Sequence, residues 1–147
     1  MSSIVLTTDL SPESERAFKP AVLLAERLGL SIVLLAVLEY LPFEPTAGGL
    51  VSVYPDRGRI HADWSKRLAE LTKALGSAVP VRSVLIEAAD VPRAIVEFAH
   101  KEQAAFLAIA THGRSGLRRF LLGSVAESVL RHAHIPVLVY PPPGGVA

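Results

Sequence analysis

Hydrophobic positions along this chain fall into two alternating kinds of segment. Short, mostly apolar runs are typical of strands buried on both faces of a parallel sheet. Between them, apolar residues recur at every third or fourth position, which is typical of helices that place one face on a core. The runs lie at residues 4–6, 31–38, 80–87, 104–110 and 135–140, and the periodic segments lie at 12–28, 59–75, 90–99 and 124–132. This alternation predicts an α/β fold: an open parallel sheet of five strands with four helices on its two faces.

Punctuating residues predict where some of these elements begin and end. Ser11 followed by Pro12 predicts a helix start, with the serine as N-cap and the proline in the first turn. Gly29 predicts the C-terminal end of the same helix, and Asp90 predicts the N-cap of the third helix. Residues 40–58 are rich in proline and glycine and predict a long loop.

The composition of the 147 residues indicates one globular domain. Half of the residues are apolar and 20% are charged, which argues against disorder. The net charge is only +1, which argues against a protein that coats nucleic acid. Cysteine is absent, which excludes disulfides, thiolate nucleophiles and cysteine-ligated metals. We expect the domain to span residues 1–140 and residues 141–147 to form a flexible Pro/Gly tail.

The apolar runs also bear on the expected location of the protein. None approaches the roughly 20 residues that a membrane-spanning helix needs. The first residues contain neither a basic region nor the apolar stretch of a secretory signal. We therefore expect a cytoplasmic protein that has neither a membrane nor a nucleic acid as its partner.

Residues 110–125 carry the strongest chemical signal in the sequence, because they join a buried strand to a helix start. No acidic residue occurs between Gln103 and Ala126, whereas three arginines do: Arg114, Arg118 and Arg119. Glycines at 113 and 123 would allow a phosphate to approach the backbone, and a helix N-terminus attracts anions. The pattern favours an anion site, although a glycine turn with solvated arginines explains the same spacing.

Other chemical motifs are absent or interrupted. The sequence contains neither the GxxxxGK[ST] phosphate loop nor the GxGxxG dinucleotide fingerprint. A GxSxG nucleophile motif is broken at Leu117. The pair His132 and His134 follows a helix end, where histidine complements the helix dipole, so a metal site is not favoured. Asp9, after the first strand, either organises a turn or serves a ligand, by accepting hydrogen bonds from a base amine or a ribose hydroxyl or by reaching a metal-bound water.

Three segments of the chain resemble the universal stress protein family: Thr7-Thr-Asp-Leu-Ser-Pro-Glu-Ser14 at the start, Ala110-Thr-His-Gly-Arg-Ser-Gly116 with Leu122-Gly-Ser-Val-Ala-Glu127, and Ile135-Pro-Val-Leu-Val139. The nucleotide motif of that family is Gly-x2-Gly-x9-Gly-Ser/Thr. Gly113 and the pair Gly123-Ser124 match it, and Ala110 stands at the first glycine. The resemblance implies a Rossmann-like fold of the adenine nucleotide alpha hydrolase type, with strand order 3-2-1-4-5.

The resemblance also implies a set of ligand contacts and a cofactor. The ligand would be ATP or AMP, with Mg²⁺ carried on the phosphates. The implied contacts are Thr7, Thr8 and Asp9 beside the adenosine, Val37 at the adenine, Ile109 and Ala110 at the ribose, and His112, Gly113, Arg114, Gly123, Ser124 and Val125 around the phosphates.

A homodimer is the third expectation that follows from the resemblance. Its interface would be the last strand, at Val137, Leu138 and Val139. We expect a nucleotide-binding regulatory protein of the stress response, because the sequence shows no strong base for phosphoryl transfer. Two alternatives stay open: a dimeric interaction protein that binds no nucleotide, and a slow ATPase.

Overall fold

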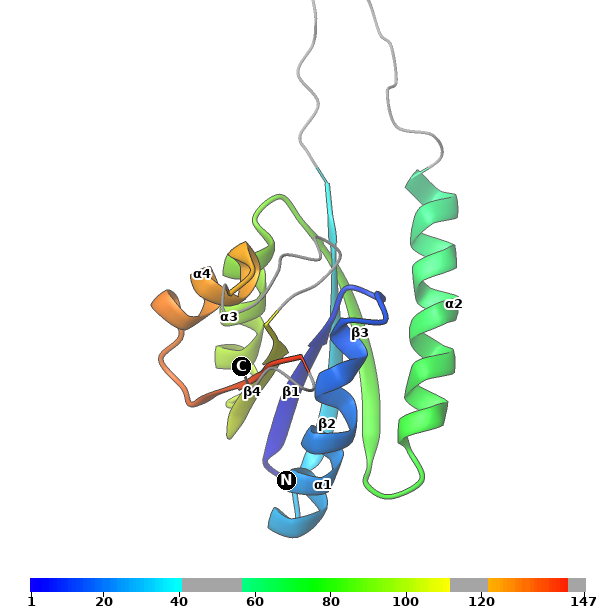
Figure 1. Ribbon diagram of the computed structural model, residues 1–147. Coiled ribbons are helices and arrows are strands. Elements are labelled where there is room, and N and C mark those ends of the chain that lie inside the picture. The colour runs from blue at the N-terminus through cyan, green and yellow to red at the C-terminus, as the bar shows by residue number, and fades with distance from the viewer. Residues whose placement is uncertain (41–56, 112–121, 143–147) are drawn as a thin grey trace, which may run out of the picture.

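A computed structural model describes residues 1–40, 57–111 and 122–142 of the chain (Figure 1). Five parallel strands form one sheet in the order β3-β2-β1-β4-β5. The strands are β1 (Ser3–Thr8), β2 (Ser31–Glu39), β3 (Val81–Ala88), β4 (Phe106–Ala110) and β5 (Val137–Tyr140). The expected fold class and strand order are both confirmed. Residues 143–147 of the expected tail lie outside the described residues.

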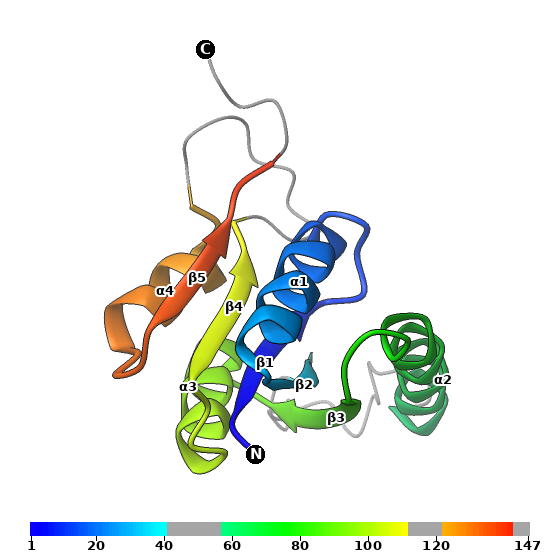
Figure 2. The ribbon, with the colours of Figure 1, turned by 90° about the horizontal axis from the view of Figure 1, so that it is seen from below.

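Four α-helices cover the sheet, two on each face. They are α1 (Phe18–Leu28), α2 (Arg57–Leu75), α3 (Val91–Lys101) and α4 (Ser124–His132), and a short 3-10 helix, η1 (Ser14–Ala17), precedes α1. Figure 2 shows α1 and α2 on one side of the sheet and α3 and α4 on the other. None of the helices in the described part is long and apolar enough to cross a membrane.

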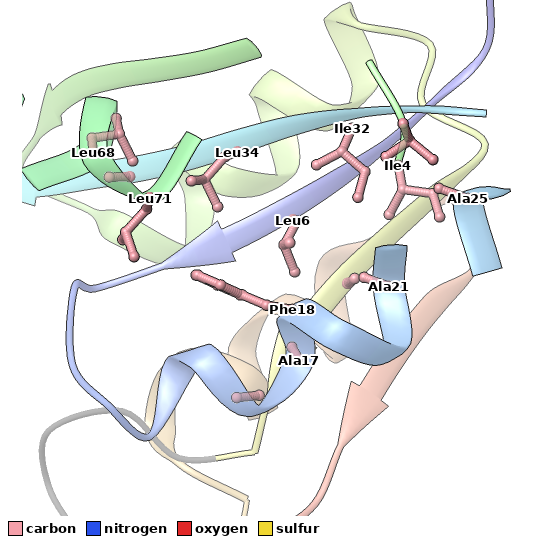
Figure 3. Close-up of a cluster of buried hydrophobic side chains, with 14 residues drawn as sticks. Ile4, Leu6, Ala17, Phe18, Ala21, Ala25, Ile32, Leu34, Leu68 and Leu71 are labelled. Carbon is pink, nitrogen blue, oxygen red and sulfur yellow. The ribbon is translucent and has the colours of Figure 1, made fainter. Parts of the chain in front are cut away.

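The two faces of the sheet bury separate apolar clusters, because successive side chains of a strand point to opposite faces. Ile4 and Leu6 of β1 pack against α1 and α2, together with Leu34 of β2 (Figure 3). Val5 and Val33, the intervening residues, pack against α3 and α4. Strands this apolar on both faces can only lie inside a helix-covered sheet, so the core itself fixes the layered architecture.

The start of the first helix differs from the sequence prediction. The α-helix begins at Phe18 rather than after Ser11, and the residues between form a turn and η1. The reason is that hydroxyl and carboxylate side chains at residues 8–14 bond to nearby backbone groups and compete with helical bonds. Ser11 nevertheless acts as a cap of this turn, since its Oγ accepts from the Ser14 N–H at 3.3 Å.

The other two predicted end residues are confirmed. Gly29 ends α1 in the left-handed conformation, with φ +65°, which glycine adopts without strain. Asp90 caps α3, where its Oδ1 accepts from the N–H of Arg93 at 3.2 Å. The predicted loop lies mostly at 41–56, outside the described residues.

Candidate functional site

A cavity of about 260 Å³ opens at the carboxyl ends of the central strands. In an open parallel sheet, ligands bind at this edge where the strand order reverses, which here is between β1 and β4. The cavity lies on the α3 and α4 side of the sheet, since both helices supply part of its wall. Its lining comprises Thr7, Thr8, Asp9, Ser14, Leu35, Val37, Val91, Ile95, Ile109, Ala110, Thr111, Gly123, Ser124, Val125 and Ala126.

One part of the cavity wall is apolar. Leu35 and Val37 come from β2, Val91 and Ile95 from α3, and Ile109 from β4. Leu35, Val37, Ile95 and Ile109 belong to the buried cluster on this face of the sheet, and Val91 packs against it. Such a wall suits a flat apolar group, because it offers van der Waals contact without competing polar atoms.

A second part of the wall is the N-terminus of α4. Gly123 is the N-cap residue and is buried, and as a glycine it has no side chain with which to cap the helix. The first N–H groups of a helix have no partner within the helix and carry partial positive charge. The N–H of Gly123 donates to the carbonyl oxygen of Thr111 at 2.7 Å, which ties the helix start to the end of β4. This end of the cavity is therefore built to receive an anion.

The end of β1 supplies the polar side chains between these two parts. The Thr7 hydroxyl donates across to the carbonyl oxygen of Ala108 on β4 at 3.4 Å. The Oδ1 atom of Asp9 accepts from the N–H of Ser11 at 2.9 Å and also from its hydroxyl. Thr8 and Ser14 join their hydroxyls at 2.8 Å. All of these bonds form within the chain, so the polar edge of the cavity is fixed before any ligand arrives.

Ala110 stands at the first glycine of the family's nucleotide motif, and its side chain points away from the apolar wall of the cavity. Along β4, Leu107 and Ile109 pack into the α3 and α4 cluster, whereas Ala108 and Ala110 pack into the α1 and α2 cluster. Ala110 also lines the cavity. Because strand side chains alternate, its methyl group lies on the opposite face of the sheet from Ile109. A methyl group in this direction leaves the apolar wall open.

All the expected ligand contacts that fall within the described residues line this one cavity. They are Thr7, Thr8, Asp9, Val37, Ile109, Ala110, Gly123, Ser124 and Val125. The expected contacts His112, Gly113 and Arg114 lie outside the described residues. The roles of all these residues as ligand contacts, inside and outside the described part of the chain, stay predictions.

Sequence reasoning missed several lining residues, among them Ser14, Val91 and Ile95. Ile95 belongs to the periodic segment 90–99, whose apolar face packs on the sheet, and it lies both in the buried cluster and on the cavity wall. Ser14 ends the segment 7–14 that resembles the universal stress protein family. Its position close to Asp9 in the sequence was the signal that could have identified it as a lining residue.

The two histidines near the end of α4 lie elsewhere. His132 and His134 line a separate groove between α3 and α4, together with His100. The Nδ1 atom of His132 lies 2.8 Å from the carbonyl oxygen of Ser128, one turn back in the helix. Within residues 1–40, 57–111 and 122–142, no three histidine or carboxylate side chains are arranged to hold a metal ion.

Comparison with known proteins shows the family of this chain. The profile of the universal stress protein family matches residues 1–141. A universal stress protein of Methanocaldococcus jannaschii, MJ0531, is 34% identical over 145 residues, which cover 95% of this chain and 82% of the relative.

Two solved structures of similar fold contain nucleotides. One is a universal stress protein from Archaeoglobus fulgidus in complex with dAMP, with a TM-score of 0.69 and 22% identity, covering 95% of this chain and 97% of that one. The other is a universal stress protein in complex with cAMP, with a TM-score of 0.64 and 24% identity, covering 94% of each chain. With a match of this extent to the family profile, the chain belongs to the universal stress protein family.

Proposed function

We propose that this chain binds an adenine nucleotide, AMP or ATP, and acts as a regulatory protein of the stress response. One observation carries the proposal: a single cavity joins an apolar wall, fixed oxygen atoms and the N-terminus of α4, whose N-cap residue is a glycine. A nucleotide has the matching three parts, which are a flat base, a sugar with hydroxyl groups and a charged phosphate. The dAMP and cAMP complexes of similar proteins support this assignment.

The lining residues suggest an orientation for the ligand. The base would lie against Val37 and Ile109, and the phosphates would lie at Gly123, Ser124 and Val125. The sugar would then fall between them, beside Thr8 and Asp9. We propose that His112, Gly113 and Arg114 complete the phosphate contacts. A magnesium ion would be carried on the phosphates, since Mg²⁺ is commonly held by substrate phosphates and water.

Calorimetric titration with AMP, ATP and GTP, with and without Mg²⁺, tests the proposal. We expect dissociation constants for AMP or ATP well below about 1 mM, which corresponds to about −4 kcal/mol of binding free energy. Gly123→Val places a branched side chain at the helix start and should weaken binding at least about tenfold, through lost backbone contact with phosphate. Ala133→Val, at the other end of α4, is the matched control and should leave affinity unchanged.

Failure of every adenine nucleotide to bind below about 1 mM would remove the proposal and favour a protein that acts through interactions alone. Turnover is measured separately as phosphate release, with Ser124→Ala as the comparison. Release above background in the wild type would favour the slow ATPase instead.

We further propose that two copies of the chain associate through β5, at Val137, Leu138 and Val139. In the described part of the chain, β5 pairs only with β4, so its other edge is available to a second strand. A nucleotide in the cavity could then influence the dimer through β4, which touches both the cavity and β5. A cytoplasmic location stays a prediction of the sequence.

A further inference from the structure

The groove between α3 and α4 holds His100, His132 and His134 and has a volume of about 500 Å³. It shares no lining residue with the cavity at the carboxyl ends of the strands. We infer that this groove is a docking site for a short acidic segment of a partner protein, and that it binds the segment more tightly as the pH falls. The inference concerns a second surface, so it does not rest on the proposed function.

The topology brings the basic residues of the groove to one end. Each of the two helices follows a strand of the parallel sheet and returns to the start of the next, so both helices end at the amino edge of the sheet. His100 and Lys101 are the last two residues of α3. His132 is the last residue of α4, and His134 follows two positions later. Asp90, at the start of α3, lines the opposite end of the groove, which is therefore acidic at one end and basic at the other.

The carboxylates around the basic end are already paired with arginines. The pairs, measured from side-chain nitrogen to carboxylate oxygen, are Arg93 with Glu97 at 2.8 Å, Arg131 with Glu127 at 2.9 Å, and Arg82 with Glu102. Among the described residues, no carboxylate pairs with Lys101. An incoming acidic group therefore meets the Lys101 ammonium and the three imidazoles, and the nearest competing carboxylates are neutralised.

The hydrogen bond of His132 makes this end sensitive to pH. The carbonyl oxygen of Ser128 can only accept, so the Nδ1 atom of His132, 2.8 Å away, carries a proton and donates it. In the neutral ring the Nε2 atom then has a lone pair and no proton, so it offers a carboxylate nothing. When the ring takes up a proton, Nε2 becomes a donor and the ring gains positive charge. Histidine makes this change between about pH 5 and pH 8, whereas the carboxyl groups of an acidic segment stay largely ionised there.

The shape of the groove indicates an extended segment as its occupant. The groove follows α3 from Asp90 to Lys101, and the 11 residues of this helix span about 16 Å. An extended chain covers about 3.3 Å per residue, so about five residues fit along it. Val96 lies midway, is partly buried and lines the groove, so it offers an apolar contact. The best occupant has a small apolar residue at its centre, acidic residues at one end and no negative charge at the other.

Amide chemical shifts of the isotope-labelled protein, titrated with the pentapeptide acetyl-Ala-Ala-Val-Asp-Glu-amide, test the inference. We expect shifts at Val96, His100 and His132, and binding at least about threefold tighter at about pH 6 than at about pH 8, because each exposed ion pair contributes a factor of about two to five. The uncharged peptide acetyl-Ala-Ala-Val-Asn-Gln-amide is the matched ligand control. It should bind at least about threefold more weakly at the lower pH and show no pH dependence.

Substitutions separate the imidazoles from the fixed charge. His100→Gln and His132→Gln should each bring the affinities at the two pH values closer together, because glutamine takes up no proton. Lys101→Gln should weaken binding about equally at both pH values, since lysine stays charged across this range. His61→Gln on α2 is the control for loss of an imidazole away from the groove and should change neither quantity. The amide spectrum of each variant reports directly whether it is folded.

Several results would overturn the inference. One is the absence of peptide binding at both pH values, and another is equal binding of the charged and uncharged peptides. Shifts caused by Zn²⁺ but not by the peptide would make the imidazoles metal ligands instead. A preference for the lower pH that survives both histidine substitutions would place the pH-sensitive group elsewhere. None of these results bears on the cavity, whose test is the binding of adenine nucleotides.

Discussion

Ala110 is the residue at which this chain departs from the nucleotide motif of its family, and its side-chain direction predicts a mild effect. Its methyl group packs on the α1 side of the sheet, 7% exposed, rather than on the apolar wall of the cavity. We therefore expect Ala110→Gly to leave AMP affinity within about twofold, a change of roughly 0.4 kcal/mol. The same change should lower the free energy of unfolding by about 1–2 kcal/mol, through the lost methyl burial and the greater freedom of the unfolded chain.

Urea denaturation and calorimetry on the same samples separate the two effects. Ala108→Gly is the matched control, because Ala108 lies on the same strand and face but does not line the cavity. Both variants should lose similar stability, and neither should change affinity. A gain of about tenfold in AMP affinity for Ala110→Gly alone would show that the methyl group obstructs the ligand after all.

Sequence reasoning at the level of residues located the cavity where one short segment carried the signal, while the roles of these residues as ligand contacts stay predictions. Asp9 and Gly123 were identified from their neighbours in the sequence, and both line the cavity. Val91 and Ile95 could not be assigned in this way, because a helix face that packs on a sheet looks the same whether it is covered or borders a cavity. Only the three-dimensional placement of α3 beside α4 decides whether this helix face is covered or borders the cavity.

At the level of elements, the N-cap of α3 offers a direct test. Asp90 Oδ1 accepts from the Arg93 N–H, so it satisfies one of the helix's otherwise unpaired donors. Asp90→Ala should lower the free energy of unfolding by about 1 kcal/mol, measured as a lower urea midpoint at unchanged slope. Asp90→Asn keeps an acceptor oxygen and should stay within a few tenths of a kcal/mol of the wild type. Equal losses in both variants would indicate that the charge, not the capping bond, supports the helix.

The first helix shows why element boundaries were harder to predict than element types. The pair Ser11-Pro12 is typical of a helix start, and the hydroxyl of Ser11 does accept from the Ser14 N–H. The same hydroxyl also donates to Asp9, which holds the preceding loop in a shape that a continuous helix cannot follow. Because of these two local bonds, the α-helix begins only at Phe18. The competition between side-chain bonds and helical backbone bonds does not show in the periodicity of apolar residues.

At the scale of the whole molecule, the topology of the fold could be predicted from the sequence more completely than the residues of the candidate site. Alternating strands and helices restrict the fold to a parallel sheet covered on both faces, and the family resemblance added the strand order. The described chain leaves β3 and β5 at the two edges. The apolar clusters extend to β5 on both faces, where Leu138 packs against one and Val139 against the other. This edge therefore combines apolar side chains with backbone groups that β4 does not use.

The hydrogen bonds to β4 show which backbone groups of β5 face outward. The carbonyl oxygens of Pro136 and Tyr140 accept from Leu107 and Thr111 of the neighbouring chain segment, each at 3.0 Å. Residues of a parallel strand alternate between its two neighbours, so the N–H of Val139 points to the open edge. Val139→Pro removes that donor while keeping the bonds to β4, and edge strands tolerate proline at such positions.

If β5 forms the proposed dimer, sedimentation velocity should show wild-type protein and Val139→Thr as dimers, because threonine keeps the N–H and the branched shape. Val139→Pro should shift toward the monomer, since a strand pair loses its bond at the centre of the interface. Retained AMP binding by Val139→Pro would show that the shift does not come from unfolding, because the cavity lies at β1 and α4 rather than on the open edge. A wild-type protein that sediments as a monomer, or a folded Val139→Pro that remains a dimer, would contradict this interface and require that the copies meet elsewhere or not at all.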